Sequence, residues 1–196
     1  LRAAGANISE VARPNLDFEH YHHVYLLLLR AATGTILSES EFQDHLEGAR
    51  LRSVSDHSYR AHIDRGVSLH YKQWWHLHNE REKFRIEWKR FFSDYDVLLC
   101  PVAASTAFPH DHSGERDDRT IPINGQPEAV VDQLFWAGIT TLARLPSSVI
   151  PVGTAADNLP CGLQIITDYL EDYTALEFAG LAEQTLGGFM PPSGFH

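Results

Sequence analysis

The residues that could carry chemistry in this sequence begin with a serine pair. Ser147 and Ser148 stand between Pro146 and an apolar run, with no glycine beside them. A nucleophilic serine needs a base within hydrogen-bond reach and oxyanion donors, which a glycine-rich turn usually supplies. The G-x-S-x-G turn of one class of serine hydrolases is also absent. This pattern favours two serines that pack at the edge of a strand.

A Ser-Lys mechanism would need a buried lysine with a lowered pKa. The chain has three lysines, Lys72, Lys83 and Lys89, and all fall in one amphipathic helical pattern rich in Glu and Arg. Each is typical of a solvated helix face. We therefore assign no catalytic residue in this chain.

Twelve histidines raise the possibility of a metal site. His76 and His78 are two residues apart and point in different directions on a helix, whereas zinc pairs on a helix prefer a spacing of four. His110 and His112 lie in a loop and could share an ion, which keeps a metal site open as a weaker alternative. No H-E-x-x-H or paired-cysteine motif accompanies them. We favour solvated histidines and expect no metal, and the absence of glycine-rich phosphate motifs predicts no cofactor.

Composition narrows the classes of partner. Hydrophobic residues make up 43% of the 196 residues, and the net charge is -10. This balance argues against nucleic acid and against a polybasic membrane patch, and favours a neutral or cationic small ligand. No apolar run is long enough to span a bilayer. Cys100 and Cys161 sit inside apolar runs, which favours reduced thiols and a cytoplasmic location.

The first part of the chain, about 1–95, has mostly helical patterns. A helix is predicted from Asp17, as N-cap, to Thr33, and a capping box at Ser38 predicts another. A long helical pattern covers 59–92, with an interruption near Gly66. A short strand is expected at 7–12. Residues 1–5 are typical of a helix end, which together with the missing initial Met indicates a piece of a longer protein.

The pattern changes in the second part, 96–196. Apolar runs at 96–100, 147–151 and 161–167 predict strands, and the last two flank a turn at 157–158. A long loop is expected at 104–125, a helix from Pro127 to Ala143, and an amphipathic helix at 172–186. We therefore predict one α/β unit over 1–196, with a mixed sheet flanked by helices.

Three segments carry a resemblance to the amidase signature family. They are Asp96-Val-Leu-Leu-Cys-Pro101, Leu145-Pro-Ser-Ser-Val-Ile-Pro-Val-Gly153 and Asn158-Leu-Pro-Cys-Gly-Leu-Gln-Ile-Ile166. The likeness covers nearly the whole chain and is thin from 18 to 90. Departures are few: Arg144 stands where the family usually has Gly, Ser147 where it has Ala, and Cys161 where it has Val.

The resemblance implies a partial amidase fold. The family hydrolyses amides with a Ser nucleophile, a bridging Ser and a Lys base, carried by segments that this chain does not contain. It also implies that a helix before Leu145 lines the acyl pocket, where Trp136, Ile139, Thr140 and Ala143 share one face. The alternative is that this face is ordinary core. The loop 108–120 is a weaker candidate for a pocket cover.

Two functions follow as hypotheses. The first is the C-terminal, substrate-side part of an amidase that converts a carboxylic amide to an acid and ammonia or an amine. Its partners would be a small-molecule amide and the missing N-terminal catalytic half, and the isolated chain would be inactive. The alternative is a non-catalytic amidase-like binding or assembly module. Truncation would leave an open sheet edge and an uncovered apolar face, which predicts that the isolated chain associates with itself into a homo-oligomer.

Overall fold

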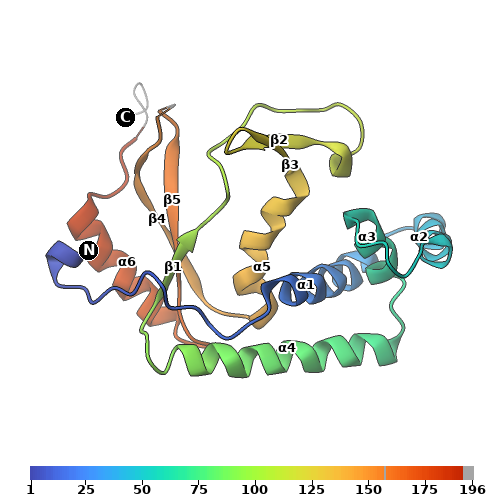
Figure 1. Ribbon diagram of the computed structural model, residues 1–196, viewed down its shortest axis with the longest axis horizontal. Helices are drawn as coiled ribbons and strands as arrows, with labels where there is room; N and C mark the ends of the chain where they lie inside the picture. The colour runs from blue at the N-terminus through green and yellow to red at the C-terminus, as the bar shows by residue number, and fades with distance from the viewer. Residues whose placement is uncertain (157, 192–196) are drawn as a thin grey trace.

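Four helices occupy the first part of the chain in the computed structural model, which describes residues 1–156 and 158–191 (Figure 1). They are α1 (Phe18–Thr33), α2 (Glu39–Leu51), α3 (Tyr59–Val67) and α4 (Tyr71–Phe91). The Asp17 carboxylate accepts from the N–H groups of Glu19 and His20, and Ser38 and Glu41 form the expected capping box. The predicted starts of α1 and α2 are confirmed, because a side-chain acceptor satisfies backbone donors that the first turn leaves free.

The interruption predicted near Gly66 separates α3 from α4. Gly66 itself stays helical, and the chain leaves the helix at Ser68. A Cβ at Gly66 would collide with the Cβ of Arg30 on α1. The glycine is therefore needed for the close approach of α3 to α1, and the break follows it. The strand expected at 7–12 is absent, since these residues form turns and irregular backbone.

Three strands form the main sheet. They are β1 (Leu98–Pro101), β4 (Ser147–Thr154) and β5 (Pro160–Ile166), in the order β1-β5-β4. The three predicted strands and the α/β class are confirmed. We expected a mixed sheet, whereas both described strand pairs of this sheet are antiparallel. Helix α6 (Asp172–Leu186) runs along this sheet and buries Ala175 and Ala182, as its amphipathic pattern predicts.

A hairpin replaces part of the predicted loop and the start of the predicted helix. Strands β2 (Thr120–Ile123) and β3 (Gln126–Ala129) pair around Asn124 and Gly125, whose φ values are 50° and 79°. Positive φ at both central residues is the requirement of a tight hairpin turn. Pro127 therefore lies in β3, and α5 (Leu134–Ala143) begins only after a 3-10 turn at Val130–Gln133. The prediction of a helix from Pro127 is wrong over its first part.

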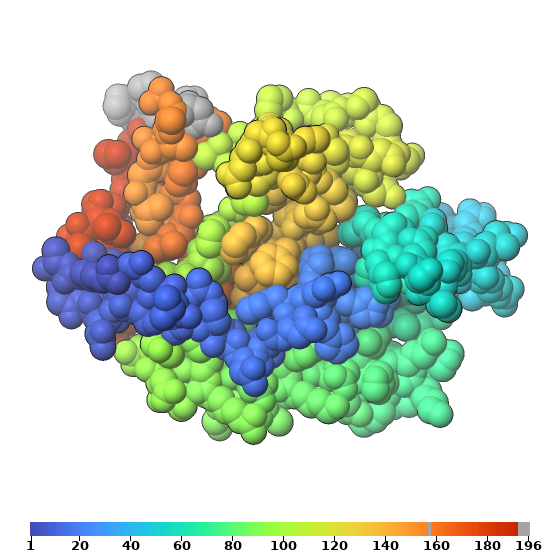
Figure 2. Space-filling view, in the orientation of Figure 1, coloured from blue at the N-terminus to red at the C-terminus, as the bar shows by residue number. Residues whose placement is uncertain are grey.

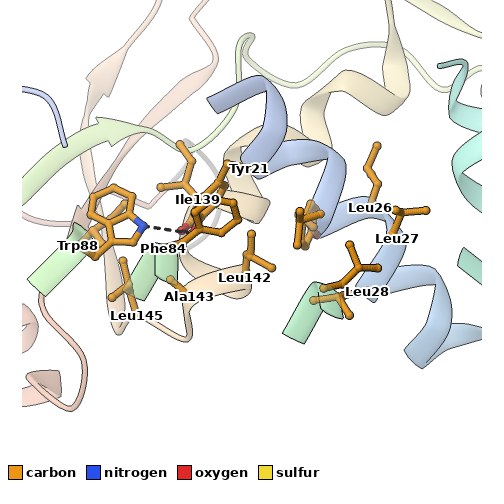
Figure 3. Packing of buried hydrophobic residues seen from close by; sticks show 14 of the residues in the cluster. Tyr21, Leu26, Leu27, Leu28, Phe84, Trp88, Ile139, Leu142, Ala143 and Leu145 are labelled. Carbon is orange, nitrogen blue, oxygen red and sulfur yellow. Dashed lines mark hydrogen bonds between the residues drawn. The ribbon is translucent and has the colours of Figure 1, made fainter. Parts of the chain in front are cut away.

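The largest core lies where α1, α4 and α5 meet (Figures 1 and 3). Tyr21, Trp88 and Ala143, one from each helix, are almost completely buried there. A second, smaller core joins the sheet to α6 through Ile150, Ile165 and Ala182. In the part of the chain that the structure describes, no helix is both long and apolar enough to cross a membrane.

Candidate functional site

A cavity of about 680 Å³ lies beside the ends of the three main strands. We call it the strand cavity. Its lining comes from the chain after β1, from the middle of β4 and from the start of β5, at residues 101–107, 149–151, 160–162 and Phe189. In Figure 2 the surface is hollowed between the orange strands and the yellow hairpin, next to the segment that follows β1. The three segments that carry the family resemblance thus contribute to a single cavity.

Strand register brings these segments together. Pro101 lies opposite Leu163, and Pro151 lies opposite Gly162, so both neighbours of β5 reach the cavity at the same level. The pairing of β4 is then shifted between Pro151 and Gly153. Such a bulge re-aims a strand and is common beside sites.

Gly162 allows the side chains of the two neighbouring segments to pack closely against β5 at this end of the sheet. A Cβ there would lie 3.1 Å from Val149 Cγ1 and 3.2 Å from Val102 Cγ2. These contacts are tighter than ordinary van der Waals packing, so a side chain would push the two valines apart. Glycine therefore lets the segment after β1 and the strand β4 approach β5 from opposite sides.

Few polar groups line the strand cavity. The Ser105 hydroxyl is buried and has no hydrogen-bond partner among the described residues. Cys161 is half-buried and is not in a disulfide. The loop is held by Gln133, whose side-chain oxygen accepts from the Ala104 N–H at 2.8 Å. A mostly apolar pocket with an unpaired hydroxyl is suited to a small ligand with one polar group. Sequence reasoning missed Ser105, because a lone serine in a polar loop carries no pattern.

The serines and lysines considered for catalysis lie apart. Ser147 and Ser148 are in β4, opposite Ile166 and Ile165, which confirms them as strand residues. Every lysine lies on α4 with its side chain exposed. A Ser-Lys mechanism needs a buried lysine beside the serine, and these exposed lysines do not provide one.

The second thiol, Cys100, sits beside the cavity but does not line it. Burial raises its pKa, and the Gln164 side-chain amide donates to Sγ at 3.5 Å. Gln164 is itself buried and lies opposite Cys100 in the sheet. A thiol held in its neutral form is a poor nucleophile, so this pair is structural.

The face of α5 predicted to line the acyl pocket points largely into the helical core. Ile139, Thr140 and Ala143 are buried with exposed fractions of 5%, 8% and 0%. Trp136 is only half-buried and packs at the edge of the same core. None of the four lines the strand cavity. The segment after β1 lines the strand cavity only as far as Ala107, so the loop 108–120, which we expected to cover a pocket, does not line this one. The substrate role of these residues stays a prediction.

Tyr21 holds this face in place. Its hydroxyl donates to the Ile139 carbonyl at 2.8 Å and accepts from Trp88 Nε1 at 3.2 Å, as Figure 3 shows for the pair with Trp88. Burial raises the pKa of Tyr21 well above its usual range, so the hydroxyl stays protonated and able to donate. One side chain thereby ties α1 to both α4 and α5.

The histidines form local contacts. His110 and His112 are exposed, with ring centroids 5.9 Å apart. His62 Nδ1 donates to the Ser58 carbonyl at 2.9 Å, so its Nε2 accepts from His23 Nδ1 at 2.8 Å. Within 1–156 and 158–191, no group of three or more His, Cys, Asp or Glu is arranged to hold a metal ion.

Comparison with known proteins decides the family. The family model described as Amidase matches residues 1–176. The chain belongs to the amidase family. The sequence resemblance is therefore confirmed, and it extends through α1 to α4, where the motifs are thin.

Several curated proteins are similar to this chain. A glutamyl-tRNA(Gln) amidotransferase subunit from Maricaulis maris is 24% identical over 208 residues, which cover 98% of this chain and 40% of that protein. The indoleacetamide hydrolase of Bradyrhizobium diazoefficiens is 32% identical over 124 residues, covering 61% of this chain and 21% of that protein. The chain spans about two fifths of the length of the first of these relatives.

Solved structures share the fold. A crystal structure of an amidase has a TM-score of 0.67 and 25% identity, and the match covers 95% of this chain and 39% of that one. A 6-aminohexanoate cyclic dimer hydrolase, solved with its substrate, has a TM-score of 0.59 at 17% identity, with the same shares covered. The second likeness shows the fold alone.

Proposed function

We propose that this chain is the substrate-side, C-terminal part of an amidase that hydrolyses a carboxylic amide to an acid and ammonia or an amine. The observation that carries the proposal is the strand cavity, because the three segments that resemble the family line it together. The family match over residues 1–176 supports the same interpretation. The small-molecule amide would be the ligand, and the cytoplasmic location stays a prediction from the sequence.

The nucleophile and the base would come from outside these 196 residues. The three lysines are exposed on α4, and the two serines of β4 pair within the sheet. Hydrolysis needs a nucleophile and a base within hydrogen-bond reach of each other, and no lysine forms a hydrogen bond with a serine among the described residues. What these residues supply in the proposal is the apolar wall and the Ser105 hydroxyl.

A serine-reactive fluorophosphonate tests whether the nucleophilic serine lies outside these 196 residues. The isolated chain and the complete product of its gene would be incubated with the probe, and the intact masses compared. We expect one adduct on the complete product and none on the isolated chain. An adduct on the isolated chain would overturn the proposal and return attention to Ser147 and Ser148, with Ser147→Ala and Ser148→Ala as the locating variants.

The α5 face is proposed as a further wall of the acyl pocket, with Trp136 the part of it that the helical core leaves accessible. Trp136→Ala in the complete product should raise KM more than it lowers kcat, because it removes apolar binding surface away from the reacting atoms. Tyr71→Ala is the matched control, since Tyr71 is 75% exposed on α4. Equal kinetics for the two variants would remove Trp136 from the pocket.

A non-catalytic binding or assembly module remains the second candidate. The observation that favours it is the exposed position of every lysine. The native mass of the gene product and the probe separate the two candidates. A product of about the mass of this chain, 22.1 kDa, without an adduct would favour the module.

A further inference from the structure

A second cavity, larger than the strand cavity, lies among the helices and shares no lining residue with it. Its volume is about 1070 Å³, at the upper end of the sizes typical of ligand pockets. Helices α2 and α3 sit at one end of the molecule, above the first half of α4 (Figure 1). We call this space the helix groove, and its lining includes residues of all four helices.

Apolar side chains form the base and part of the sides of the helix groove. Leu27 of α1 and Leu77 of α4 are buried at its base, with exposed fractions of 7% and 9%. Leu46 and Leu69 are half-buried along its sides. Trp75 adds a large aromatic surface that is half open to solvent. An elongated apolar body would bury against these side chains, which is favourable in proportion to the area covered.

The charge of the helix groove is opposite to that of the chain. Arg50, Arg65 and Lys72 line it, and none of its lining residues is Asp or Glu. The whole chain has 26 acidic residues against 16 Lys and Arg. The Lys and Arg residues of the lining, with no carboxylate beside them in it, create a local positive field that attracts an anion. The net charge of the whole chain, taken alone, favours neutral or cationic ligands.

These cations have no carboxylate partner among the described residues. Arg65 donates to the backbone carbonyls of Asp56 at 2.6 Å and Ser53 at 2.5 Å. The side chains of Arg50 and Lys72 form no hydrogen bond or ion pair within the described part of the chain, and both are exposed. Elsewhere on α4, by contrast, Lys83 pairs with Glu80 at 2.6 Å. The cations of the groove are therefore available to an incoming anion.

The start of α4 adds to this field. His70, Lys72 and Gln73 line the groove at the first turn of this 21-residue helix, and no acidic residue stands in that turn. His70 and Gln73 form a capping box at this N-terminus, and the dipole of the helix favours a negative group near it. The acidic first turns of α1 and α2 show that other helices here supply their own negative charge.

We propose that the helix groove binds an amphipathic carboxylate, a molecule with an extended apolar body and one carboxylate group, such as a fatty-acid anion. The apolar side chains hold the body, and Arg50, Lys72 and the start of α4 receive the carboxylate. A single carboxylate suits one exposed cation on each of two helices. A nucleic acid does not suit it, because the acidic remainder of the surface repels a long polyanion.

Calorimetric titration of the chain with dodecanoate, below the concentration at which it forms micelles, tests the proposal. Dodecanol carries the same apolar body without charge, dodecyltrimethylammonium reverses the charge, and acetate lacks the body. We expect saturable binding of dodecanoate, with dodecanol about tenfold weaker or more, since a charged hydrogen bond contributes about 1.5–3 kcal/mol. The cationic amphiphile and acetate should show no saturable binding.

Variants locate the site. Arg50→Gln/Lys72→Gln should weaken dodecanoate binding about tenfold or more. The control Lys89→Gln/Arg116→Gln removes the same charge from two exposed positions outside the groove and should leave binding within about twofold. Trp75→Phe should abolish the change in tryptophan fluorescence that accompanies binding. Circular dichroism confirms that each variant is folded.

Four results would overturn the proposal. Equal affinity for dodecanoate and dodecanol would show that the cations play no part. Equal weakening by both double variants would show that only the overall charge matters. Undiminished binding by Arg50→Gln/Lys72→Gln, or the absence of saturable binding by the unaltered chain, would show that the anion is not held in the helix groove.

Discussion

Tyr21 joins three helices through one hydroxyl, which donates to the Ile139 carbonyl and accepts from Trp88 Nε1. Tyr21→Phe keeps the ring but leaves the buried Trp88 N–H without its acceptor and removes the bond to the Ile139 carbonyl. An unsatisfied buried group costs about 1–3 kcal/mol, and we expect the free energy of unfolding to fall by about that amount. Urea denaturation followed by circular dichroism measures it.

The control for this change is Tyr173→Phe on α6. Tyr173 is 87% exposed, so water already solvates its hydroxyl and the free energy of unfolding should change by less than about 0.5 kcal/mol. An equal and small effect of both variants would mean that the hydroxyl of Tyr21 does not tie the helices.

His23 makes stability depend on pH. Its pKa is lowered from 6.5 to about 4, first by burial and then by the neighbouring His62, His20, His57 and Arg65. Between these two pH values the unfolded chain binds a proton at His23 that the folded chain does not bind. The contribution of His23 to the free energy of unfolding is therefore fully present above pH 6.5 and is lost as the pH falls toward 4.

We expect the free energy of unfolding to fall between about pH 7 and 5, above the range in which carboxylates titrate. His23→Gln should flatten this fall, whereas His110→Gln, on an exposed loop, should not. The measurement is urea denaturation at several pH values. An unchanged slope in His23→Gln would contradict the assignment.

At the scale of elements, two glycines inside helices are expected to respond oppositely to alanine. A Cβ at Gly138 of α5 would lie 2.6 Å from Tyr25 Cδ1 on α1, whereas a Cβ at Gly180 of α6 would meet nothing within 4 Å. The first glycine therefore sets how closely α5 approaches α1. At Gly180 no neighbour requires glycine, so the residue only lowers the stability of the helix through its greater backbone freedom in the unfolded chain.

In a helix interior, alanine in place of glycine raises the free energy of unfolding by up to about 1 kcal/mol. Forcing extra atoms into a packed contact lowers it by about 1–3 kcal/mol. Gly138→Ala should therefore lower the free energy of unfolding by up to about 2 kcal/mol. Gly180→Ala should raise it by about 0.5–1 kcal/mol. Urea denaturation of both variants checks the pair, and stabilisation by Gly138→Ala would show that α1 is free to move aside.

At the scale of the whole molecule, the sheet and α6 leave surfaces that we expect to associate. Among the described strands, β1 and β4 have an unpaired edge. Large apolar side chains are exposed along α6 and beside it, namely Leu170, Tyr173, Leu176, Leu181, Phe189 and Met190. Open edges and contiguous apolar surface favour contact between copies.

We predict a homo-oligomer whose mass rises with concentration. Light scattering over a concentration series measures it, and Leu176→Lys/Leu181→Lys should shift the chain toward the monomer. The matched control is Ile86→Lys, which is 54% exposed on a different helix, α4. A clean monomer of the unaltered chain at high concentration would refute the prediction.

The sequence by itself determined several of the helix ends and the three main strands. Asp17, the Ser38 capping box and Gly187 act within about four residues of themselves, so their meaning does not depend on distant parts of the chain. Amphipathic spacing likewise identifies α6 from its own residues. The family resemblance rested on motifs of this local kind.

The start of α5 could have been predicted better. Pro127 suits a first helical turn and also an edge strand, and we chose the helix. Asn124-Gly125, which precedes Gln126 and Pro127, is the signal for a hairpin, since this pair accepts positive φ at both positions. The pairing of Pro127 with Pro122 settles the choice.

Only the tertiary structure decided which residues share a cavity. The strand cavity combines 101–107, 149–151 and 160–162, and the helix groove combines cations from three helices. It also decided that Ile139 and Ala143 face α1 and α4. Periodicity shows that residues lie on one face of a helix, but long-range packing chooses what that face meets, because the burial energy depends on the neighbour.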